Sequence, residues 1–154
     1  MQITLLCVGK LKAQPFRDGV AEYAKRLGRY TTLKQVDVKE ERGNQPVEIV
    51  LAREGERLLQ ALPNRAFAVA LDPTGQTGTS EDLAKRLSSL ALNGKSRIAF
   101  LIGGAFGLSD AVLARANIRL SLSRMTFPHE LARLILVEQL YRAFTIQRGE
   151  PYHK

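Results

Sequence analysis

The feature that most limits what this chain can fold into is a pair of short apolar runs near its end, each followed by a loop. The first run covers 98–102 and leads into Gly103-Gly104-Ala105-Phe106-Gly107, and the second covers 118–122 and leads into 123–129. A short apolar run bounded by glycine is typical of a buried strand, and terminal glycines let backbone N–H groups approach a ligand. Because open α/β sheets bind ligands at the carboxyl ends of their strands, we expect both loops to line one crevice.

The rest of the chain alternates between strand-like and helix-like segments. Alternating or short buried apolar runs predict strands at 2–8, 33–38, 67–71, 98–102 and 118–122. Helical spacing predicts helices at 16–30, 46–62, 79–92, 109–116 and from 128 to 144. We expect a loop at 39–45 and a turn at 72–75. This alternation is typical of a mostly parallel sheet with helices on both faces, in a single domain over 1–154.

The composition excludes several classes of protein. No apolar run approaches the roughly 18 residues of a membrane helix, and we expect no signal peptide after Met1. Cys7 is the only cysteine, which rules out an intrachain disulfide and fits a reducing cytoplasm; we expect it in the core. His129 and His153 are the only histidines and have no cysteine nearby, so we expect no metal site.

The net charge of +8 favours a polyanionic partner. The excess of basic residues is distributed evenly along the chain: there are 12 basic and 8 acidic residues over 1–65, and 11 basic and 7 acidic residues over 66–154. No basic tail is present, so the charge indicates a cationic face of the fold. Nucleic acid is therefore favoured as the partner over the alternative of a basic protein that is merely soluble.

The glycine loop does not match a dinucleotide-binding fingerprint. Its pattern, Gly103-Gly104-x-x-Gly107, follows the fourth predicted strand, and no acidic residue ends the next strand, so a nicotinamide cofactor is disfavoured. We expect Gly103 to leave room for the backbone to approach a ligand, with any Cβ there projecting into the crevice. The alternative is a tight strand-to-helix turn without a ligand.

The second loop is the stronger signal. Arg124 is its only charged residue before His129, and hydroxyl side chains alternate with apolar ones. We expect such a segment to be buried, with amides free to pair with a flat heterocycle such as adenine; a plain buried loop is the alternative. Asp72, at the end of the third strand, is either a turn residue or a further ligand contact.

The last predicted helix and the tail raise two further possibilities. We expect the helix to be amphipathic, with one face formed by Leu131, Leu134, Ile135, Glu138 and Arg142. Together with Leu140 and Phe144 this stripe is more apolar than one small sheet requires, which indicates a two-fold interface. Glu138 and Arg142 form either a structural ion pair or part of a subunit seam beside the crevice. Residues 147–154 have no apolar periodicity, so we expect packing to give them little order.

Taken together, four motifs are recognisable. They are Leu-Ile-Gly-Gly-x-x-Gly-Leu-Ser at 101–109, Leu-Ser-x-Met-Thr-Phe-Pro-His at 122–129, Leu-x-Glu-Gln-Leu-Tyr-Arg-Ala at 136–143 and the terminal Pro-Tyr-His-Lys. This combination resembles the bacterial ribosomal RNA large subunit methyltransferase H family, within the SPOUT superfamily of trefoil-knotted proteins. The resemblance covers the whole chain.

The resemblance implies a fold, a cofactor and a reaction. The fold would be an α/β knot with a C-terminal trefoil, assembled as a homodimer through the last helix. The cofactor would be S-adenosylmethionine, and the family's binding positions correspond to Leu71, Gly103, Gly104, Leu122, Ser123, Arg124, Met125, Thr126 and Phe127. The reaction would be methylation of N3 of a pseudouridine in a 23S rRNA hairpin on the assembled ribosome. His153, Arg142 and Tyr152 are the candidate catalytic residues, and a non-catalytic RNA-binding protein of the ribosome is the alternative.

Overall fold

A five-stranded parallel sheet forms the middle layer of the computed structural model, which describes all of residues 1–154. Its strands are β1 (Gln2–Val8), β2 (Thr32–Val38), β3 (Phe67–Gln76), β4 (Arg97–Ile102) and β5 (Ile118–Leu120). Their order across the sheet is β2-β1-β4-β3-β5, and every neighbouring pair runs parallel. The predicted parallel sheet is therefore confirmed.

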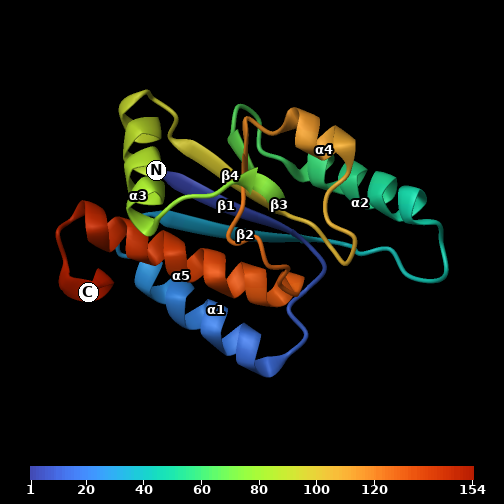
Figure 1. The fold of residues 1–154 in the computed structure, drawn as a ribbon, viewed down its shortest axis with the longest axis horizontal. Helices are drawn as coiled ribbons and strands as arrows, with labels where there is room; N and C mark the ends of the chain where they lie inside the picture. Colours follow the sequence, from blue (N-terminus) through green and yellow to red (C-terminus); the bar gives the residue numbers. More distant parts are fainter.

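Helices cover both faces of this sheet. They are α1 (Gln14–Leu27), α2 (Val47–Ala61), α3 (Ser80–Leu92), α4 (Asp110–Arg115) and α5 (His129–Gln147), followed by a single 3₁₀ turn η1 (Pro151–His153). The helices α1, α3 and α5 pack on one face, and α2 and α4 pack on the other (Figure 1). No helix combines the length and the apolar character that a membrane span requires.

The alternation of side chains along β1 divides the interior into two cores. Ile3, Leu5 and Cys7 face the larger core beneath α1, α3 and α5, whereas Leu6 and Val8 face the smaller core beneath α2 and α4. Successive residues of a strand point to opposite faces, so a strand covered on both faces is apolar at most positions. This explains why β1 is read from the sequence as a continuous apolar run.

Local side chains fix where two of the helices begin. The Thr79 hydroxyl accepts a hydrogen bond from the Asp82 N–H (3.1 Å), and the Asp82 carboxylate accepts one from the Thr79 N–H (2.9 Å). This reciprocal arrangement satisfies N–H groups that the first turn of α3 leaves unpaired. The Ser109 hydroxyl likewise accepts from the Val112 N–H (3.3 Å) at the start of α4. α4 therefore begins directly after the glycine loop.

The expected turn at 72–75 is wrong as an end of β3. The Asp72 carboxylate does accept hydrogen bonds from the N–H and the hydroxyl of Thr74, which is the local turn chemistry that the sequence indicated. The strand nevertheless resumes, because Leu71 and Gln76 both pair with Leu120 of β5 across a bulge. Pairing with a distant strand overrides the local turn signal.

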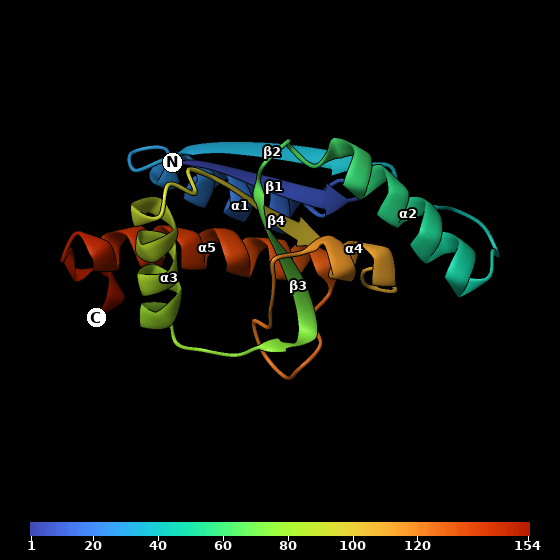
Figure 2. The ribbon, with the colours of Figure 1, turned by 90° about the horizontal axis from the view of Figure 1, so that it is seen from above.

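The last helix is not amphipathic, contrary to the expectation from its sequence. α5 packs against both α1 and α3 on one face of the sheet (Figure 2), and no residue from His129 to Ile146 is fully exposed. Leu140 and Phe144, expected at an interface between subunits, are buried in the core of the chain itself. Its polar residues are covered as well, since Arg133 is buried and pairs with Asp37 and Gln35 of β2. Apolar and polar positions therefore lie all round α5, which has neighbours on most sides.

The C-terminal tail is ordered by specific contacts, which corrects a second expectation. The Tyr30 hydroxyl donates to the Glu150 carboxylate (2.6 Å), and this hydrogen bond raises the pKa of Tyr30 to about 12. The Tyr152 ring packs edge-on against Tyr141 (4.7 Å between centroids). Aromatic and hydrogen-bonding contacts of this kind have no periodicity, so the sequence pattern did not reveal them.

Candidate functional site

A cavity of about 800 Å³ opens at the carboxyl ends of three strands. Its walls come from 71–73 at the bend of β3, from 102–108 after β4, and from Leu120 and the loop that follows β5. His129 and Ala132 of α5 complete it. The two loops singled out in the sequence therefore meet at one site, where parallel sheets bind ligands.

Most of the predicted cofactor-binding residues line this cavity. They are Leu71, Gly103, Gly104, Leu122, Ser123, Met125, Thr126 and Phe127. Arg124 is the exception, because it is exposed and does not line the cavity. Asp72, which the sequence left as either a turn residue or a ligand contact, also lines the cavity, and so does His129 at the end of the second predicted loop.

The glycine loop is a closed turn. Gly104 and Gly107 pair as a short antiparallel bridge, and the Gly107 N–H donates to the Gly104 carbonyl (3.1 Å). Gly107 has a φ of +83°, a conformation that favours glycine. A Cβ on Gly103 would overlap the carbonyl of Gly107. The expectation that this Cβ would enter the crevice is thus wrong: glycine at 103 is required so that the turn can fold onto itself.

A buried carboxyl group lies behind this turn. Glu54 of α2 is 4 % exposed, and its Oε2 accepts a hydrogen bond from the Glu41 N–H (3.0 Å), but its Oε1 is buried without a partner. Burial raises the pKa of Glu54 above its ordinary value. The sequence signal was present, because Glu54 occupies a position on the apolar side of the predicted helix 46–62.

The loop after β5 is more exposed than its composition predicted. The Ser121 hydroxyl donates to the Ser123 carbonyl (2.8 Å), and the Ser123 hydroxyl accepts from the Met125 N–H (3.0 Å). The serines thus satisfy the loop's own polar groups, while Arg124, Met125 and Thr126 are exposed. The expectation of a fully buried segment is wrong because side chains of the loop, not core contacts, fix its shape.

Two of the three candidate catalytic residues lie together. The Arg142 guanidinium lies over the Tyr152 ring (4.9 Å from its centroid) and pairs with Glu138 through two nitrogens (2.6 and 3.0 Å). The Tyr152 hydroxyl lies within hydrogen-bonding distance of Glu138 (3.1 Å) and of Tyr23 (3.2 Å). The ion pair that the sequence offered as one of two alternatives is therefore present, and tyrosine contacts extend it.

The environment of this group fixes its protonation. The hydrogen bond to Glu138 raises the pKa of Arg142, so its guanidinium stays charged. Burial, followed by the contacts with Tyr23 and Glu138, raises the pKa of Tyr152, so its phenol stays neutral. His153 follows in the same 3₁₀ turn, and its Nδ1 is buried without a partner.

This group does not lie at the cavity of its own chain. Ala132 lines the cavity and Arg142 follows it by ten residues on α5, which corresponds to about 15 Å along the helix. Figure 1 shows the C-terminus at the far end of α5 from the loop after β5. Within one chain, therefore, the predicted cofactor residues and the predicted catalytic residues form two separate sites.

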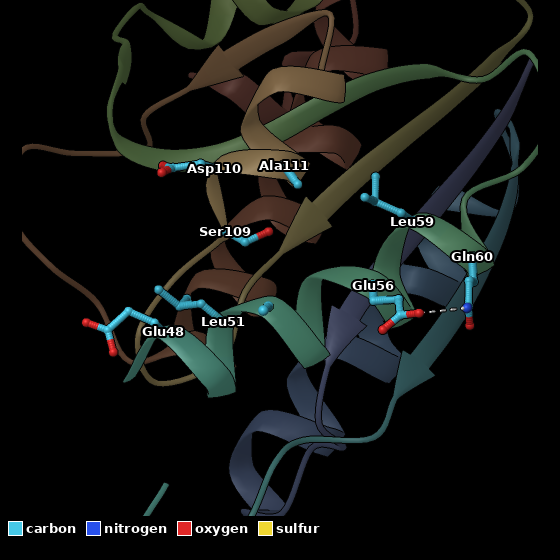
Figure 3. Close-up of a pocket in the computed structure, with 9 residues that line it drawn as sticks. Glu48, Leu51, Glu56, Leu59, Gln60, Ser109, Asp110 and Ala111 are labelled. Atoms are coloured by element: carbon cyan, nitrogen blue, oxygen red, sulfur yellow. Dashed lines mark hydrogen bonds between the residues drawn. The ribbon is translucent and has the colours of Figure 1, made fainter. Parts of the chain in front are cut away.

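A second cavity, of about 600 Å³, lies between α2 and α4 (Figure 3). Its charged lining residues are Glu48, Glu56 and Asp110, and no basic side chain lines it. The Gln60 amide donates to the Glu56 carboxylate (3.5 Å) along its rim. An acidic lining repels phosphate, so this cavity does not suit a nucleic acid.

Sequence comparisons extend over the whole chain. A family model described as "Predicted SPOUT methyltransferase" matches residues 1–153. Ribosomal RNA large subunit methyltransferase H of Bacillus pumilus is 49 % identical over 159 aligned positions that cover 100 % of both chains. The protein of the same name from Pelotomaculum thermopropionicum is 52 % identical, with 98 % of each chain covered.

Solved structures share the fold at low sequence identity. A probable methylase family protein from Haemophilus influenzae Rd KW20 aligns with a TM-score of 0.55 and 12 % identity, over 99 % of this chain and 70 % of that one. A probable methyltransferase from Bordetella pertussis Tohama I aligns with a TM-score of 0.54 and 15 % identity, over 92 % and 95 % of the two chains. At this level the similarity concerns the arrangement of the sheet and helices.

Proposed function

Because the chain belongs to the SPOUT methyltransferase family, we propose that it methylates N3 of a pseudouridine in a 23S rRNA hairpin on the assembled ribosome, with S-adenosylmethionine as the donor. The observation that carries the proposal is the meeting of the glycine loop and the loop after β5 at one cavity. The full-length similarity to relatives named ribosomal RNA large subunit methyltransferase H supports the substrate class. A ribosomal substrate implies a cytoplasmic protein.

The cavity suits a nucleoside-like cofactor. Its volume, about 800 Å³, falls within the range of small-molecule sites, and its lining combines apolar walls with a few polar groups. Leu71, Leu122 and Phe127 supply apolar surface, and Ser123 and Thr126 supply hydroxyls. S-adenosylmethionine, when bound, supplies an electrophilic methyl group on a sulfonium. The task of the protein is then mainly to position the acceptor.

The acceptor requires help with a proton. N3 of a uracil ring carries a hydrogen, so methylation at N3 requires a base to accept this proton, and a nearby cation makes its removal easier by stabilising the developing ring anion. We assign the base to His153 and the stabilisation of the anion to the guanidinium of Arg142, which stays charged beside Glu138. Tyr152 holds Arg142 through its ring and offers an aromatic face to the target base.

These roles require a second copy of the chain. The catalytic group and the cavity are about 15 Å apart along α5, and no segment of the same chain bridges them. We therefore propose a two-fold dimer packed through α5, in which the tail of each subunit reaches the cavity of its partner. The partly buried Leu131, Leu134 and Ile135 provide apolar surface on α5 for this contact.

Recognition of the RNA rests on charge and shape. The net charge of +8 is distributed over the fold and supplies contacts to phosphates, which carry little sequence information. The choice of target therefore depends on the shape of the ribosome around the hairpin.

The test is a methyl-transfer assay with labelled S-adenosylmethionine on assembled ribosomes, free large subunits and naked rRNA. The expected result is transfer to assembled ribosomes, with the product identified as N3-methylpseudouridine by mass spectrometry of the digested RNA. A protein that binds ribosomes but neither binds S-adenosylmethionine nor transfers a methyl group is the non-catalytic alternative, and this result would overturn the proposal.

A further inference from the structure

The mouth of the cavity carries two exposed apolar side chains, from two different loops. Phe106, at the tip of the glycine turn, is 54 % exposed, and Met125, in the loop after β5, is 76 % exposed. Both line the cavity. Of the six phenylalanines in the chain, Phe106 alone is exposed.

Both side chains are held outward by their backbones. The bridge between Gly104 and Gly107 closes the turn that carries Phe106 at its tip. The Ser123 hydroxyl accepts the Met125 N–H and so fixes the turn that presents Met125. A single exposed apolar side chain is ordinary, but two of them at the lining of one cavity provide apolar surface for an external contact.

The charge around the mouth favours a nucleic acid over an apolar partner. Arg124 precedes Met125 and is exposed, and the chain carries +8 in total. Asp72 is the only acidic residue in the lining of the cavity. An exposed aromatic ring, together with an exposed arginine next to Met125 in the sequence, suits an unpaired base and its phosphate, since bases of single-stranded RNA stack on aromatic side chains.

We propose that Phe106 and Met125 form a stacking platform for an unpaired rRNA base next to the methylated pseudouridine, with Arg124 contacting the adjoining phosphate. This inference rests on the proposed function and names a part of its RNA-binding surface. The platform positions the hairpin over the cavity, while the methyl donor is bound deeper, by the loop backbones.

The experiment measures RNA binding and cofactor binding separately. The RNA is a synthetic hairpin with a pseudouridine in its loop and 2-aminopurine at one neighbouring loop position at a time. Phe106→Ala should weaken hairpin affinity by about 5-fold to about 140-fold, the range for loss of one base–aromatic stack. It should also abolish the change in 2-aminopurine fluorescence at one position. The affinity for S-adenosylmethionine, measured by calorimetry, should stay within about two-fold of wild type, since the platform lies at the rim.

Matched variants separate stacking from other effects. Phe106→Tyr keeps the ring and should restore hairpin binding. Leu92→Ala removes another exposed apolar side chain, 86 % exposed at the end of α3 and outside the cavity, and should leave hairpin binding unchanged. The slope of log affinity against log salt concentration reports the number of phosphate contacts. Arg124→Ala should reduce this slope by about one contact, whereas Phe106→Ala should leave it unchanged.

Three results would overturn the inference. If Phe106→Ala lost as much affinity for S-adenosylmethionine as for the hairpin, the ring would belong to the cofactor pocket. If the variant dissociated from a dimer to a monomer in sedimentation, the ring would belong to a subunit contact. Hairpin binding equal to wild type would remove it from the RNA surface. Failure of the proposed function is distinguishable, because a wild-type protein that binds the hairpin without methylating it still reports on the platform.

Discussion

The carboxylate oxygens of Glu54 lie 3.1 and 3.4 Å from the point where a Cβ of Gly104 would stand. The glycine turn after β4 therefore rests directly on a buried carboxyl group of α2. The same carboxyl accepts the Glu41 N–H and so connects the turn with the loop before α2. Glu54 thus joins two loops at the carboxyl edge of the sheet, and its protonation bears on the stability of that edge.

Glu54→Gln should make stability less dependent on pH. Burial raises the pKa of Glu54 in the folded state above the unfolded-state pKa of about 4.5. The stability contributed by the protonated carboxyl group is therefore fully present below pH 4.5. It is lost as pH rises through the higher pKa of the folded state. Glutamine cannot ionise and keeps an acceptor for Glu41. The unfolding free energy of the variant, relative to that of wild type, should therefore increase as pH rises from 4.5. Urea titrations at a series of pH values measure this difference. A difference that does not change between pH 4 and pH 8 would contradict this.

Replacing Gly103 should damage the cofactor site more than replacing Gly104. A Cβ at 103 would overlap the Gly107 backbone, which cannot move away without opening the turn, whereas a Cβ at 104 meets the side-chain ends of Glu54 and Val8. We expect Gly103→Ala to cost roughly 1–3 kcal/mol in stability and to lower the affinity for S-adenosylmethionine by calorimetry. Gly104→Ala serves as the control with the smaller loss. Wild-type affinity in Gly103→Ala would exclude the turn from the site.

The tail should be needed for transfer and not for cofactor binding. Deletion of Tyr152–Lys154, or His153→Ala alone, should reduce the rate of methyl transfer to ribosomes by at least about 100-fold, the low end for loss of a general base. Tyr152→Phe is the milder control, because it removes only the hydroxyl contacts to Tyr23 and Glu138. A truncated protein that works at the full rate would show that the base comes from the RNA or from solvent.

A mixture of two inactive variants should recover activity. In a mixed dimer of the tail deletion with Gly103→Val, one subunit keeps its cavity and the other keeps its tail. If the tail acts across the interface, random mixing restores about a quarter of the wild-type rate, since half of the dimers are mixed and each has one competent site. Sedimentation at micromolar concentration should first show a dimer. A monomeric mass, or no recovery, would oppose action of the tail across subunits.

Cys7 should be unreactive in the native protein. Burial of the thiol raises its pKa to about 12, an effect that the nearby Arg133 only partly offsets, so almost no thiolate exists at neutral pH. Iodoacetamide at pH 8 should label the protein only on unfolding, as followed by mass spectrometry across a urea series. Rapid labelling without denaturant would show that the sheet opens locally around β1.

Much of the fold followed from short-range patterns. The apolar runs at 2–8 and 98–102 became β1 and β4 almost without change, because a central strand covered on both faces is apolar at most positions. The helix starts at Thr79 and Ser109 were also predictable, since hydroxyl caps act within three residues. Errors arose where a distant partner decided the outcome. β3 continues past its turn signal because β5 pairs with it, and α5 packs against both α1 and α3.

The sequence by itself determined the parallel α/β class and the two loops that meet at the cavity, because these depend on residue order and strand polarity. It also brought Glu138 and Arg142 within reach of each other through their helical spacing. Only the tertiary structure decided that Glu54 lies under Gly104, that Phe106 is exposed at the cavity mouth, and that Arg142 and Tyr152 lie far from the cavity of their own chain. These relationships join segments that are distant in sequence. They depend on the order of the strands across the sheet and on the direction of α5, which no local pattern of residues specifies.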